Sequence, residues 1–545
     1  MSKLKLSRRN FLKISALSIG ALTIEKGFKS EIFTLAQPEG SKEEKSKFVY
    51  TTCGICENHC AIKAYVENGI LKRLEGIPED QASGGKLCAK GHFGVKMLYD
   101  KDRLKYPLKR TNPKKSFDQD PGWVKISWEE AYDIIASKVN EAIEKYGPQS
   151  IVNIGHSVFK NLMRAIGSPN IISHASTCYA TSLLTQRILT GKMWCPDLFS
   201  SKYILSFGWD QAGKGKNVFA RGFIEAKKKG AKIVVFEPRL STTASLADLW
   251  IPIKPGTDLA VALAMINIIV NEELYDKDFV KENCYGFDKV CELVQKYTPE
   301  WAEEKSEVPA STIESVARDF ATTKPACIPV WKRGGGGPMR KNATRLTHAI
   351  IILMSLTGNI GRRGGWIPKV VRLGRVSPPQ TPPPPVTYSR VDGKEYLPLA
   401  NYGPYQSVPY QLLYDQPYHT EVVFFTRASL FSFMQPKVLA KALENKFVVN
   451  LNIYADELSY FSDIMLPESI YLERSGVVPR TTYTLFPQVS VMQPVVGKLF
   501  DTKSAEEIEY EIAKRIKIKV QPEGPSAQPT QPSQPTPPPS VEEAC

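Results

Sequence analysis

Four of the ten cysteines in the sequence have the spacing of ligands for an iron–sulfur cluster. Cys53, Cys56 and Cys60 stand on one short loop, and Cys88 stands on a later segment. A C-x2-C-x3-C run with one distant cysteine is enough to hold a cuboidal four-iron cluster. A tetrahedral zinc site is the alternative, although structural zinc sites usually show two C-x2-C pairs. The spacing therefore predicts a 4Fe-4S cluster bound by these four thiolates.

The remaining cysteines are dispersed along the chain, which argues against a disulfide framework. A free cysteine is most often an inert, buried side chain, and we interpret four of them in this way. These four are Cys195, Cys284, Cys291 and Cys327.

The N-terminus has the pattern of an export signal. Arg8 and Arg9 precede an uncharged stretch over residues 14–24, which is too short to span about 30 Å of hydrocarbon. Paired arginines before such a segment resemble the twin-arginine signal, which serves proteins that acquire a cofactor before export. Small residues near Ala36 supply a cleavage site. We expect a signal peptide over 1–36 and a periplasmic or extracytoplasmic protein, with a chance basic N-terminus as the alternative.

The composition is that of a globular protein with several domains. The chain has 545 residues, of which 42% are hydrophobic, 10% aromatic and 23% charged, and this length exceeds what one core supports. The formal net charge is +15, but the lysines are scattered and no nucleic-acid-binding motif accompanies them. A basic surface attracts anionic substrates or acidic partners instead, so we expect no nucleic acid partner.

Strand-like and helical runs alternate beyond the cysteine segment. A helix over 128–146 is predicted by apolar residues at helical spacing and by Ser127 as its cap. Strand-like runs, each followed by helix-compatible sequence, stand at 150–154, 203–207 and 232–236. This alternation is typical of a parallel sheet flanked by helices, so we predict an α/β fold. A further strand–helix–strand unit is predicted over 422–451.

These patterns divide the chain into six parts. We expect a signal peptide over 1–36, a small iron–sulfur module over 47–110, α/β cofactor-binding domains over 111–375, a proline-containing connection over 376–420, a remaining α/β segment over 421–518 and a disordered proline-rich tail over 519–545. Ligands of parallel sheets sit beyond the carboxyl ends of the strands, where Gly208 and Glu237 fall. A nucleotide-like cofactor is expected at this edge.

From about residue 48 to 515 the sequence resembles the molybdopterin oxidoreductase (dimethyl sulfoxide reductase) family. The similarity is carried by Cys53-Gly54-Ile55-Cys56 and Leu87-Cys88-Ala89-Lys90-Gly91. It implies a multidomain α/β fold, a 4Fe-4S cluster, and molybdenum or tungsten held by bis(molybdopterin guanine dinucleotide). It also implies that Lys90 lies between cluster and pterin and serves electron transfer, with a solvated surface lysine as the alternative.

Within the family, the sequence is most similar to the catalytic subunits of polysulfide and thiosulfate reductases. The match lies around Cys178, which follows residues 167–170 and His174. The resemblance implies that Cys178 is a molybdenum ligand. It also places Arg333 near the metal, where a fixed guanidinium would hold an anionic substrate. His156 is a candidate proton donor, because an imidazole titrates near neutrality, with a structural histidine as the alternative.

Five segments resemble those by which the family binds its pterin dinucleotides, and Gly334 stands in a further segment that matches the family. Their turns and backbone amides suit pyrophosphate groups. In addition to Lys90, the residues that we assign to cofactor binding are Gly208, Trp209, Glu237, Pro238, Arg239, Gly256, Thr257, Asp258, Gly334, Gly358, Asn359 and Asp463. Glu237 departs from the usual aspartate of the family, but a glutamate can still accept hydrogen bonds from guanine or ribose.

The resemblance implies a catalytic subunit that reduces polysulfide, thiosulfate or tetrathionate in anaerobic respiration. Another substrate, such as arsenate, nitrate or formate, and a non-catalytic iron–sulfur electron-transfer subunit are the alternatives. The implied partners are an iron–sulfur electron-transfer subunit and a membrane anchor subunit. Family members end in a further β-barrel, which we expect this chain to lack. If the barrel is absent, there are three alternatives: another chain supplies it, the cofactor is held more openly, or the subunit is inactive.

Overall fold

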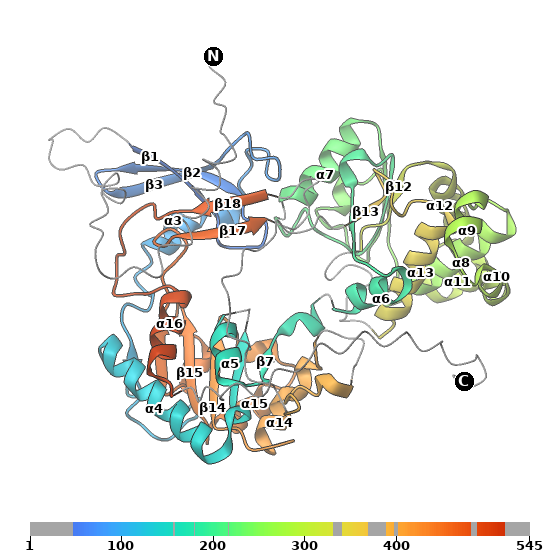
Figure 1. Cartoon of the computed structure of the whole chain (residues 1–545). Helices are drawn as coiled ribbons and strands as arrows, with labels where there is room; N and C mark the ends of the chain where they lie inside the picture. Colours follow the sequence, from blue (N-terminus) through green and yellow to red (C-terminus); the bar gives the residue numbers. More distant parts are fainter. Residues whose placement is uncertain are drawn as a thin grey trace, which may run out of the picture. The chain divides into compact units, whose positions relative to one another are not determined.

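The computed structural model describes residues 47–155, 158–178, 180–215, 217–330, 341–368, 388–396, 402–480 and 488–517 (Figure 1). The predicted signal peptide over 1–36 and the predicted tail over 519–545 lie outside these ranges, as do the clustered prolines of the predicted connection. Along the described ranges, no helix combines the length and the apolar character that a membrane span requires.

The cysteine-rich module is the part of the chain that we predict as an iron–sulfur module, residues 47–110. It begins with a three-stranded sheet in the order β1-β2-β3. Its strands are β1 (Lys47–Thr52), β2 (Ala61–Glu67) and β3 (Ile70–Gly76), and the short helices α2 (Ala89–His92) and α3 (Gly94–Leu98) follow. β2 and β3 form an antiparallel hairpin around Asn68 and Gly69, with φ of 50° and 75°. Such a two-residue turn favours Asn-Gly, because both residues need a positive φ. The loop with the first three cluster cysteines lies between the end of β1 and the beginning of β2.

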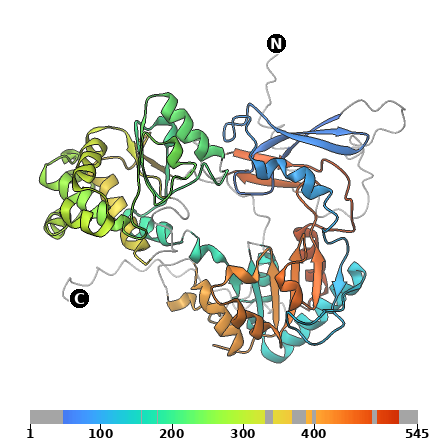
Figure 2. The same ribbon diagram turned by 180° about the vertical axis from the view of Figure 1, so that it is seen from behind.

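A later hairpin packs against this module. β17 (Gly476–Arg480) pairs antiparallel with β18 (Gln488–Met492), and the two views in Figures 1 and 2 both show it beside β1–β3. The Thr51 hydroxyl donates to the Gln493 carbonyl at 2.8 Å and accepts from the Gln493 amide at 3.0 Å. Ile470 and Leu472 lie in the same apolar core as the strands of the module. Residues from late in the chain therefore complete the cysteine-rich module.

A seven-stranded sheet combines strands from both halves of the chain. Its strands are β4 (Leu108–Lys109), β5 (Val124–Lys125), β6 (Ile151–Gly155), β7 (Ile171–Ile172), β14 (Val422–Thr426), β15 (Phe447–Asn452) and β16 (Ile464–Pro467), in the order β5-β4-β16-β15-β14-β6-β7. The strands from β16 to β7 run parallel. This parallel part contains the edge at which a ligand is expected.

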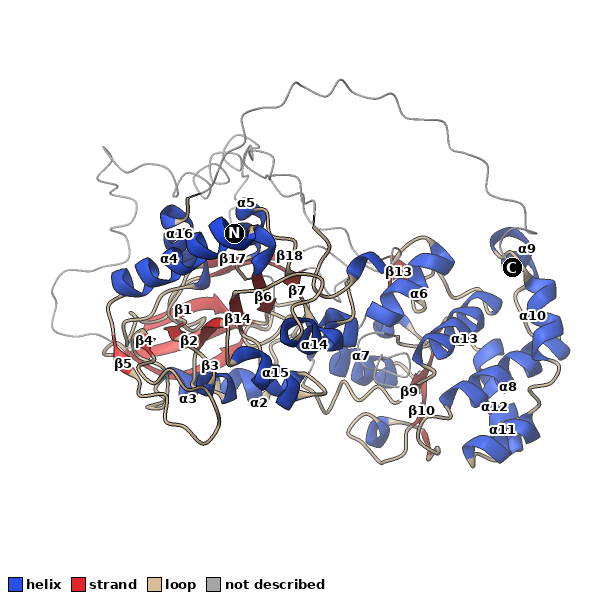
Figure 3. Ribbon diagram, turned by 90° about the horizontal axis from the view of Figure 1, so that it is seen from below, coloured by secondary structure: helices blue, strands red, loops and turns tan. Residues whose placement is uncertain are grey.

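Helices cover both faces of this sheet (Figure 3). One face packs against α4 (Trp128–Tyr146), α5 (Lys160–Ile166) and α16 (Ala505–Arg515), and the other against α14 (Val408–Leu413) and α15 (Pro436–Leu443). In β14, Phe424 belongs to the first core and Phe425 to the second, because successive side chains of a strand point to opposite faces. Burial on both faces accounts for the continuous apolar run of this strand.

A separate four-stranded parallel sheet has the order β11-β10-β9-β12. Its strands are β9 (Tyr203–Phe207), β10 (Lys232–Phe236), β11 (Leu249–Ile251) and β12 (Ala326–Cys327). The helices of this part are α6 (Ala180–Thr190), α7 (Asn217–Lys228), α8 (Asp258–Asn271), α9 (Lys277–Asn283), α10 (Phe287–Val294), α11 (Pro299–Ser306), α12 (Ala310–Thr322) and α13 (Ala343–Leu356). β8 (Trp194–Pro196) pairs antiparallel with β13 (Trp366–Pro368). One large apolar core joins this sheet to its helices.

The structure confirms the predicted α/β class and most of the predicted elements. The helix over 128–146 and the strands over 203–207 and 232–236 have the predicted bounds. The strand predicted at 150–154 forms β6, but it pairs with β14 and not with the strand at 203–207. Alternation along the sequence indicates a parallel sheet without specifying which strands pair. Segments that we assigned to different parts, 111–375 and 421–518, therefore share one sheet.

Candidate cluster and cofactor sites

The four cysteines of the cluster motif gather in the cysteine-rich module. The Cys53 amide donates to the Cys60 carbonyl at 2.9 Å, so the loop folds back on itself. Cys53 and Cys60 are buried, whereas Cys56 and Cys88 are half-buried. Burial raises the pKa of Cys53 to about 12, and the negative charges of the other three thiolates add to the rise. Bound iron would offset this repulsion, because coordination keeps a thiol deprotonated.

The loop after β9 packs against the helix that follows Cys88. The Lys90 ammonium donates to the Lys214 carbonyl. Gly215 has a φ of 62°, and a Cβ at this position would lie 2.9 Å from Lys90 Nζ and 3.1 Å from Cys88 Cβ. Glycine is therefore required at 215 both by its backbone and by the close approach. Lys90 is exposed, and its hydrogen bond connects α2 to this loop.

The carboxyl ends of β9 and β10 carry Gly208 and Glu237, as the sequence predicts. Gly208 has a φ of 59°, and its amide donates to the Phe236 carbonyl at 2.9 Å. Glu237 is buried and hydrogen-bonded to a neighbouring serine. Trp209 is fully buried, with its ring centroid 4.6 Å from that of Phe219. The Trp209 side chain thus lies in the core of this part.

Asp210 organises the loop that follows Trp209. Its carboxylate accepts hydrogen bonds from the amides of Gly213 at 3.0 Å and Thr243 at 3.1 Å, and it pairs with Arg239 at 3.1 Å. Burial raises the pKa of Asp210, but these hydrogen bonds outweigh burial and lower the pKa overall. Arg239 and its neighbour Pro238 are exposed. The guanidinium of Arg239 therefore stands at the surface of this edge, where an anionic ligand can meet it.

Gly256, Thr257 and Asp258 form the beginning of α8. Gly256 has a φ of 87°, and the Thr257 hydroxyl donates to the Lys254 carbonyl at 2.6 Å. Asp258 is buried in the first turn. Gly256 and Asp258 also line a cavity of about 60 Å³ together with the beginning of α13. The N-terminus of a helix suits a phosphate group, so this segment remains a candidate for cofactor binding.

Gly358 and Asn359 follow α13 in a tight turn. Gly358 has a φ of 65°. Asn359 is fully buried, its Oδ1 accepts from the Ala326 amide at 3.0 Å, and its Nδ2 donates to the Thr357 hydroxyl at 2.8 Å. The Asn359 side chain therefore holds the turn against β12.

Asp463 precedes β16, at the amino ends of the parallel strands. Its carboxylate accepts hydrogen bonds from Lys115 Nζ at 2.6 Å and from the Val448 amide at 2.7 Å. Parallel sheets bind ligands at their carboxyl edge. Asp463 lies at the opposite, amino edge of this sheet.

A cavity of about 560 Å³ opens at the carboxyl ends of β6, β14 and β15. Gly155 lines it at the end of β6, Arg427 directly after β14, and Asn452 at the end of β15. The other lining residues are His174, Tyr405, Ala428, Ser429, Ser432, Tyr454, Asp456 and Glu457. A Cβ at Gly155 would lie 2.0 Å from the Thr426 hydroxyl oxygen, so the strand end admits only glycine. The volume is that of an ordinary ligand site.

One guanidinium and two carboxylates determine the electrostatics of this cavity. Arg427 pairs with Glu468 through two hydrogen bonds, one of them 2.7 Å long. The Asp456 carboxylate accepts from two asparagine side chains at 2.8 and 2.9 Å, but burial still raises its pKa. Burial also opposes ionisation of Glu457, yet its hydrogen bonds lower its pKa overall. Such a lining can bind a phosphate at the guanidinium and accept the N–H groups of a purine at the carboxylates.

Cys178 ends a short turn beside this cavity. The turn is a 3₁₀ helix over His174–Thr177, and His174 lines the cavity. The Ser173 hydroxyl oxygen accepts a hydrogen bond from the Ala175 amide at 3.3 Å and caps the turn. Cys178 is buried, and its amide donates to the Ala175 carbonyl at 3.1 Å.

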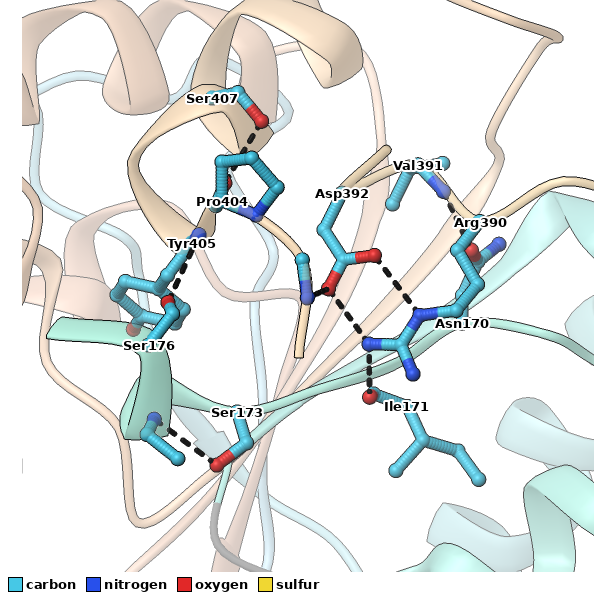
Figure 4. A network of polar contacts seen from close by, with 12 residues as sticks. Asn170, Ile171, Ser173, Ser176, Arg390, Val391, Asp392, Pro404, Tyr405 and Ser407 are labelled. Carbon is cyan, nitrogen blue, oxygen red and sulfur yellow. Dashed lines mark hydrogen bonds and ion pairs between the residues drawn. The ribbon is translucent and has the colours of Figure 1, made fainter. Parts of the chain in front are cut away.

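A segment from far along the chain holds this turn in place (Figure 4). Arg390 donates to the Ile171 carbonyl at 2.8 Å and pairs with the buried Asp392 at 2.8 and 2.6 Å. The Tyr405 amide donates to the Ser176 hydroxyl oxygen at 3.2 Å. These hydrogen bonds anchor the strand before the turn and the turn itself, which restricts the position of the cysteine that follows.

The structure brings some predicted residues together and leaves others apart. The turn with Cys178 borders the large cavity, and Lys90 lies beside the cluster cysteines. Asp463 is at the opposite edge of its sheet. Arg333, Gly334 and His156 lie outside the described residues, so their roles stay predictions from the sequence.

Comparison with protein families decides what kind of protein this is. The family model described as molybdopterin oxidoreductase matches residues 103–515, and the model described as molybdopterin oxidoreductase Fe4S4 domain matches residues 46–100. The chain belongs to the molybdopterin oxidoreductase family. It is an oxidoreductase that carries a 4Fe-4S cluster and a molybdopterin cofactor. The cluster predicted from the cysteine spacing is confirmed, and the zinc alternative is wrong.

The molybdopterin oxidoreductase is similar to characterised members of its family. It is 30% identical to the thiosulfate reductase molybdopterin-containing subunit PhsA of Salmonella typhimurium, over 94% of this chain and 69% of that protein. It is 29% identical to the arsenate respiratory reductase molybdopterin-containing subunit ArrA of a Shewanella species, over 94% of this chain and 67% of that protein. Acetylene hydratase from Pelobacter acetylenicus has a similar solved structure, with a TM-score of 0.74, 26% identity, and coverage of 86% of this chain and 69% of that one.

The residues of the molybdopterin oxidoreductase fit both cofactors. Four neighbouring thiolates on the module from β1 to α2 supply the ligand set of a cluster. The cavity at β6, β14 and β15 offers a guanidinium, carboxylates and hydroxyls at the edge where dinucleotides bind. No three His, Cys, Asp or Glu side chains of the described ranges form a site for a single metal ion.

Sequence reasoning missed most of the cavity lining. Arg427, Asn452 and Glu457 were not among the predicted residues, although two of them directly end or follow an apolar strand. The rule that ligands bind beyond the carboxyl ends of strands could have found them. The sequence leads us to expect a ligand at the ends of the strands at 203–207 and 232–236, whereas the large cavity lies at the ends of those at 422–426 and 447–452.

Proposed function

We propose that this molybdopterin oxidoreductase is the catalytic subunit of a sulfur-compound reductase that acts on polysulfide, thiosulfate or tetrathionate in anaerobic respiration. The observation that carries the proposal is Cys178, which is buried at the end of a fixed turn beside the cavity that we assign to the cofactor. A thiolate there suits a heavy redox metal. Similarity to a thiosulfate reductase subunit over 94% of the chain supports the substrate class.

Each predicted residue has a distinct role in this proposal. When bound, the molybdenum–pterin cofactor supplies two-electron chemistry, and the iron–sulfur cluster supplies single-electron transfer. Cys178 binds the metal, and Lys90 lies between the two redox centres. Arg333 holds the anionic substrate and stabilises the negative charge that develops as a sulfur–sulfur bond breaks. His156 donates a proton to the sulfur anion that leaves when the sulfur–sulfur bond breaks.

We also infer an extracytoplasmic location for the mature protein. Arg8 and Arg9 support export through the twin-arginine pathway, which carries proteins that have already received their cofactors. A reductase on that side of the membrane needs a source of electrons. We propose an iron–sulfur electron-transfer subunit and a membrane anchor subunit as partners, and the word subunit in the names of both relatives supports this assignment.

Arsenate is the second candidate substrate. The identity to the arsenate respiratory reductase subunit is 29% over 94% of the chain, close to that for thiosulfate reductase. Arsenate is also an anion that a fixed guanidinium can bind. Substrate choice in one family depends on few pocket residues, so the two candidates are distinguished by assay.

A substrate panel with a reduced viologen dye tests the proposal. Anaerobically purified protein should contain molybdenum and oxidise the dye with a sulfur anion. Arg333→Ala should lower this turnover by a factor on the order of 100 to 1,000, the usual effect of removing one preorganised charge-stabilising donor. Arg345→Ala, at an exposed arginine of α13, is the matched control. Turnover of arsenate alone, or normal turnover by Arg333→Ala, contradicts the proposal.

A further inference from the structure

The segment that holds the turn beside the large cavity is itself fixed by a buried carboxylate. We call this segment, residues 390–396 and 402–405, the brace. Asp392 in the brace is 1% exposed. Its carboxylate accepts two hydrogen bonds from the Arg390 guanidinium, at 2.8 and 2.6 Å, and a third from the Gly403 amide at 3.2 Å. The carboxylate therefore ties the two ends of the brace together.

Adjacent residues of the brace hold adjacent residues at the beginning of β7 (Figure 4). The guanidinium of Arg390 that pairs with Asp392 also donates to the Ile171 carbonyl at 2.8 Å. The Val391 amide donates to the side-chain carbonyl of Asn170 at 2.9 Å. Asn170 is fully buried, and its Nδ2 donates to a backbone carbonyl at 2.8 Å. The strand before the turn is therefore anchored at two consecutive positions.

The other end of the brace contacts the turn and the cavity lining. The Tyr405 amide donates to the Ser176 hydroxyl oxygen at 3.2 Å, two residues before Cys178. The Tyr405 ring stacks on Phe433 with the centroids 4.2 Å apart. Its hydroxyl shares a hydrogen bond of 2.9 Å with that of Ser432, which lines the cavity. The brace therefore ties the turn to the lining of the cavity.

We propose that Arg390 and Asp392 are positioning residues that fix the orientation in which the Cys178 sulfur meets the molybdenum. This inference rests on the proposed ligation of the metal by this cysteine. The turn is a 3₁₀ helix of four residues, and such short helices have poor hydrogen-bond geometry of their own. Groups behind a metal ligand commonly orient it. The position of the sulfur thus depends on contacts from the brace.

The arginine is suited to this role by its shape. A guanidinium presents its donors in a rigid planar fork, so that one side chain holds a carboxylate and a carbonyl in a fixed arrangement. Lysine carries the same charge on a flexible stem and has no such fork. Arg390 is not among the described residues that line the large cavity. Arg390→Lys therefore keeps a charge opposite Asp392, loosens the hold on β7 and leaves the cavity lining unchanged.

The test is electron paramagnetic resonance of pentavalent molybdenum in the full-length holoprotein. In Arg390→Lys the molybdenum and iron contents should equal those of the wild type. The molybdenum signal should broaden, because the sulfur ligand then occupies several positions. The kcat for the sulfur anion should fall about tenfold or more, the usual effect of losing a group that orients a metal ligand. The KM should change little, because the cavity lining is intact.

Arg515→Lys is the matched control. The Arg515 side chain is 23% exposed, against 22% for Arg390. It also donates to a carboxylate and to a backbone carbonyl, those of Glu511 at 3.0 and 2.9 Å, but it lies on α16. Its molybdenum signal and its kcat should equal those of the wild type.

Ser176→Ala is a second, independent variant, because it removes the acceptor of the Tyr405 amide and leaves the contacts of Arg390 in place. It should also broaden the molybdenum signal, and it decides alone if Arg390→Lys does not assemble. Broadening in these two variants and not in the control supports the inference, whereas unbroadened signals in the assembled variants overturn it. A failure of the proposed ligation looks different, because Cys178→Ser would then leave the wild-type signal unchanged.

Discussion

The cysteine loop and the cavity edge of the seven-stranded sheet are built in opposite ways. Three of the cluster cysteines stand on the single loop between β1 and β2. The cavity is lined by Gly155, Arg427 and Asn452, which strand pairing brings together from distant parts of the chain. In the first region the spacing of the ligands is a property of the sequence. In the second region the pairing of the strands, and not the spacing along the sequence, sets the distances between the lining residues.

The largest expected effect comes from removing one cysteine of the loop. In Cys56→Ser the cluster should be lost completely, because serine supplies no thiolate. The seven-stranded sheet should stay folded, since its two cores are formed by other residues. Iron analysis and circular dichroism measure the two outcomes separately. Cys291→Ser, at a half-buried cysteine of α10, is the control. Full iron content in Cys56→Ser would remove this cysteine from the ligand set.

A buried ion pair allows the dependence of the module on the rest of the chain to be measured. Arg103 and Glu473 pair at 2.6 Å with both side chains fully buried. Glu473→Ala should lower the free energy of unfolding by about 3–5 kcal/mol, because it leaves the Arg103 charge buried without a partner. Glu314→Ala, in a partly exposed pair with Arg318, should change it by about 0–1 kcal/mol. Urea unfolding gives both values, and equal losses would show that the pair is not energetically distinct.

Sequence reasoning succeeded where a feature depends on neighbours along the chain. The cluster motif, the cap at Ser127 and the bounds of the strands at 203–207 and 232–236 are all local patterns. The family resemblance extended this to the cofactors, which the family models confirm. The cysteine spacing alone left zinc open.

What could not be predicted depends on contacts between distant segments. The pairing of β6 with β14 follows from how two helical layers pack, and no local pattern encodes it. The same holds for Tyr471, which joins the apolar core of Cys53 and Cys60 only after the segment following β16 has packed on the cysteine-rich module. Asp463 illustrates the converse case. Its segment resembles a cofactor-binding segment of the family, but its carboxylate accepts a hydrogen bond from Lys115 at the amino edge of the sheet.

An intermediate effect is expected at the cavity. Arg427→Ala should lower the retention of the molybdopterin cofactor about tenfold or more, since hydrogen bonds to charged groups contribute about 1.5–3 kcal/mol. Glu468 would keep Arg474 as a partner at 2.9 Å, so the variant should still fold. Iron content should not change, because the cluster cysteines are elsewhere on the chain. Arg318→Ala, at an exposed arginine, is the control. Parallel loss of iron and cofactor would mean that the two regions are not independent.

The smallest expected effect is at Ser127, and it shows that local signals are not confined to the cysteine loop. Its hydroxyl oxygen accepts a hydrogen bond from the Glu130 amide at 3.0 Å, where α4 begins. Ser127→Ala should lower the free energy of unfolding by about 1 kcal/mol, whereas Ser127→Gly should cost only a few tenths, because glycine leaves the exposed amide open to water. Urea unfolding of both variants measures the difference. Equal, negligible losses would mean that α4 begins where its buried face, with Ala131 and Ile135, packs on the sheet. In that case the Ser127 cap would mark the beginning of α4 in the sequence without contributing measurably to its stability.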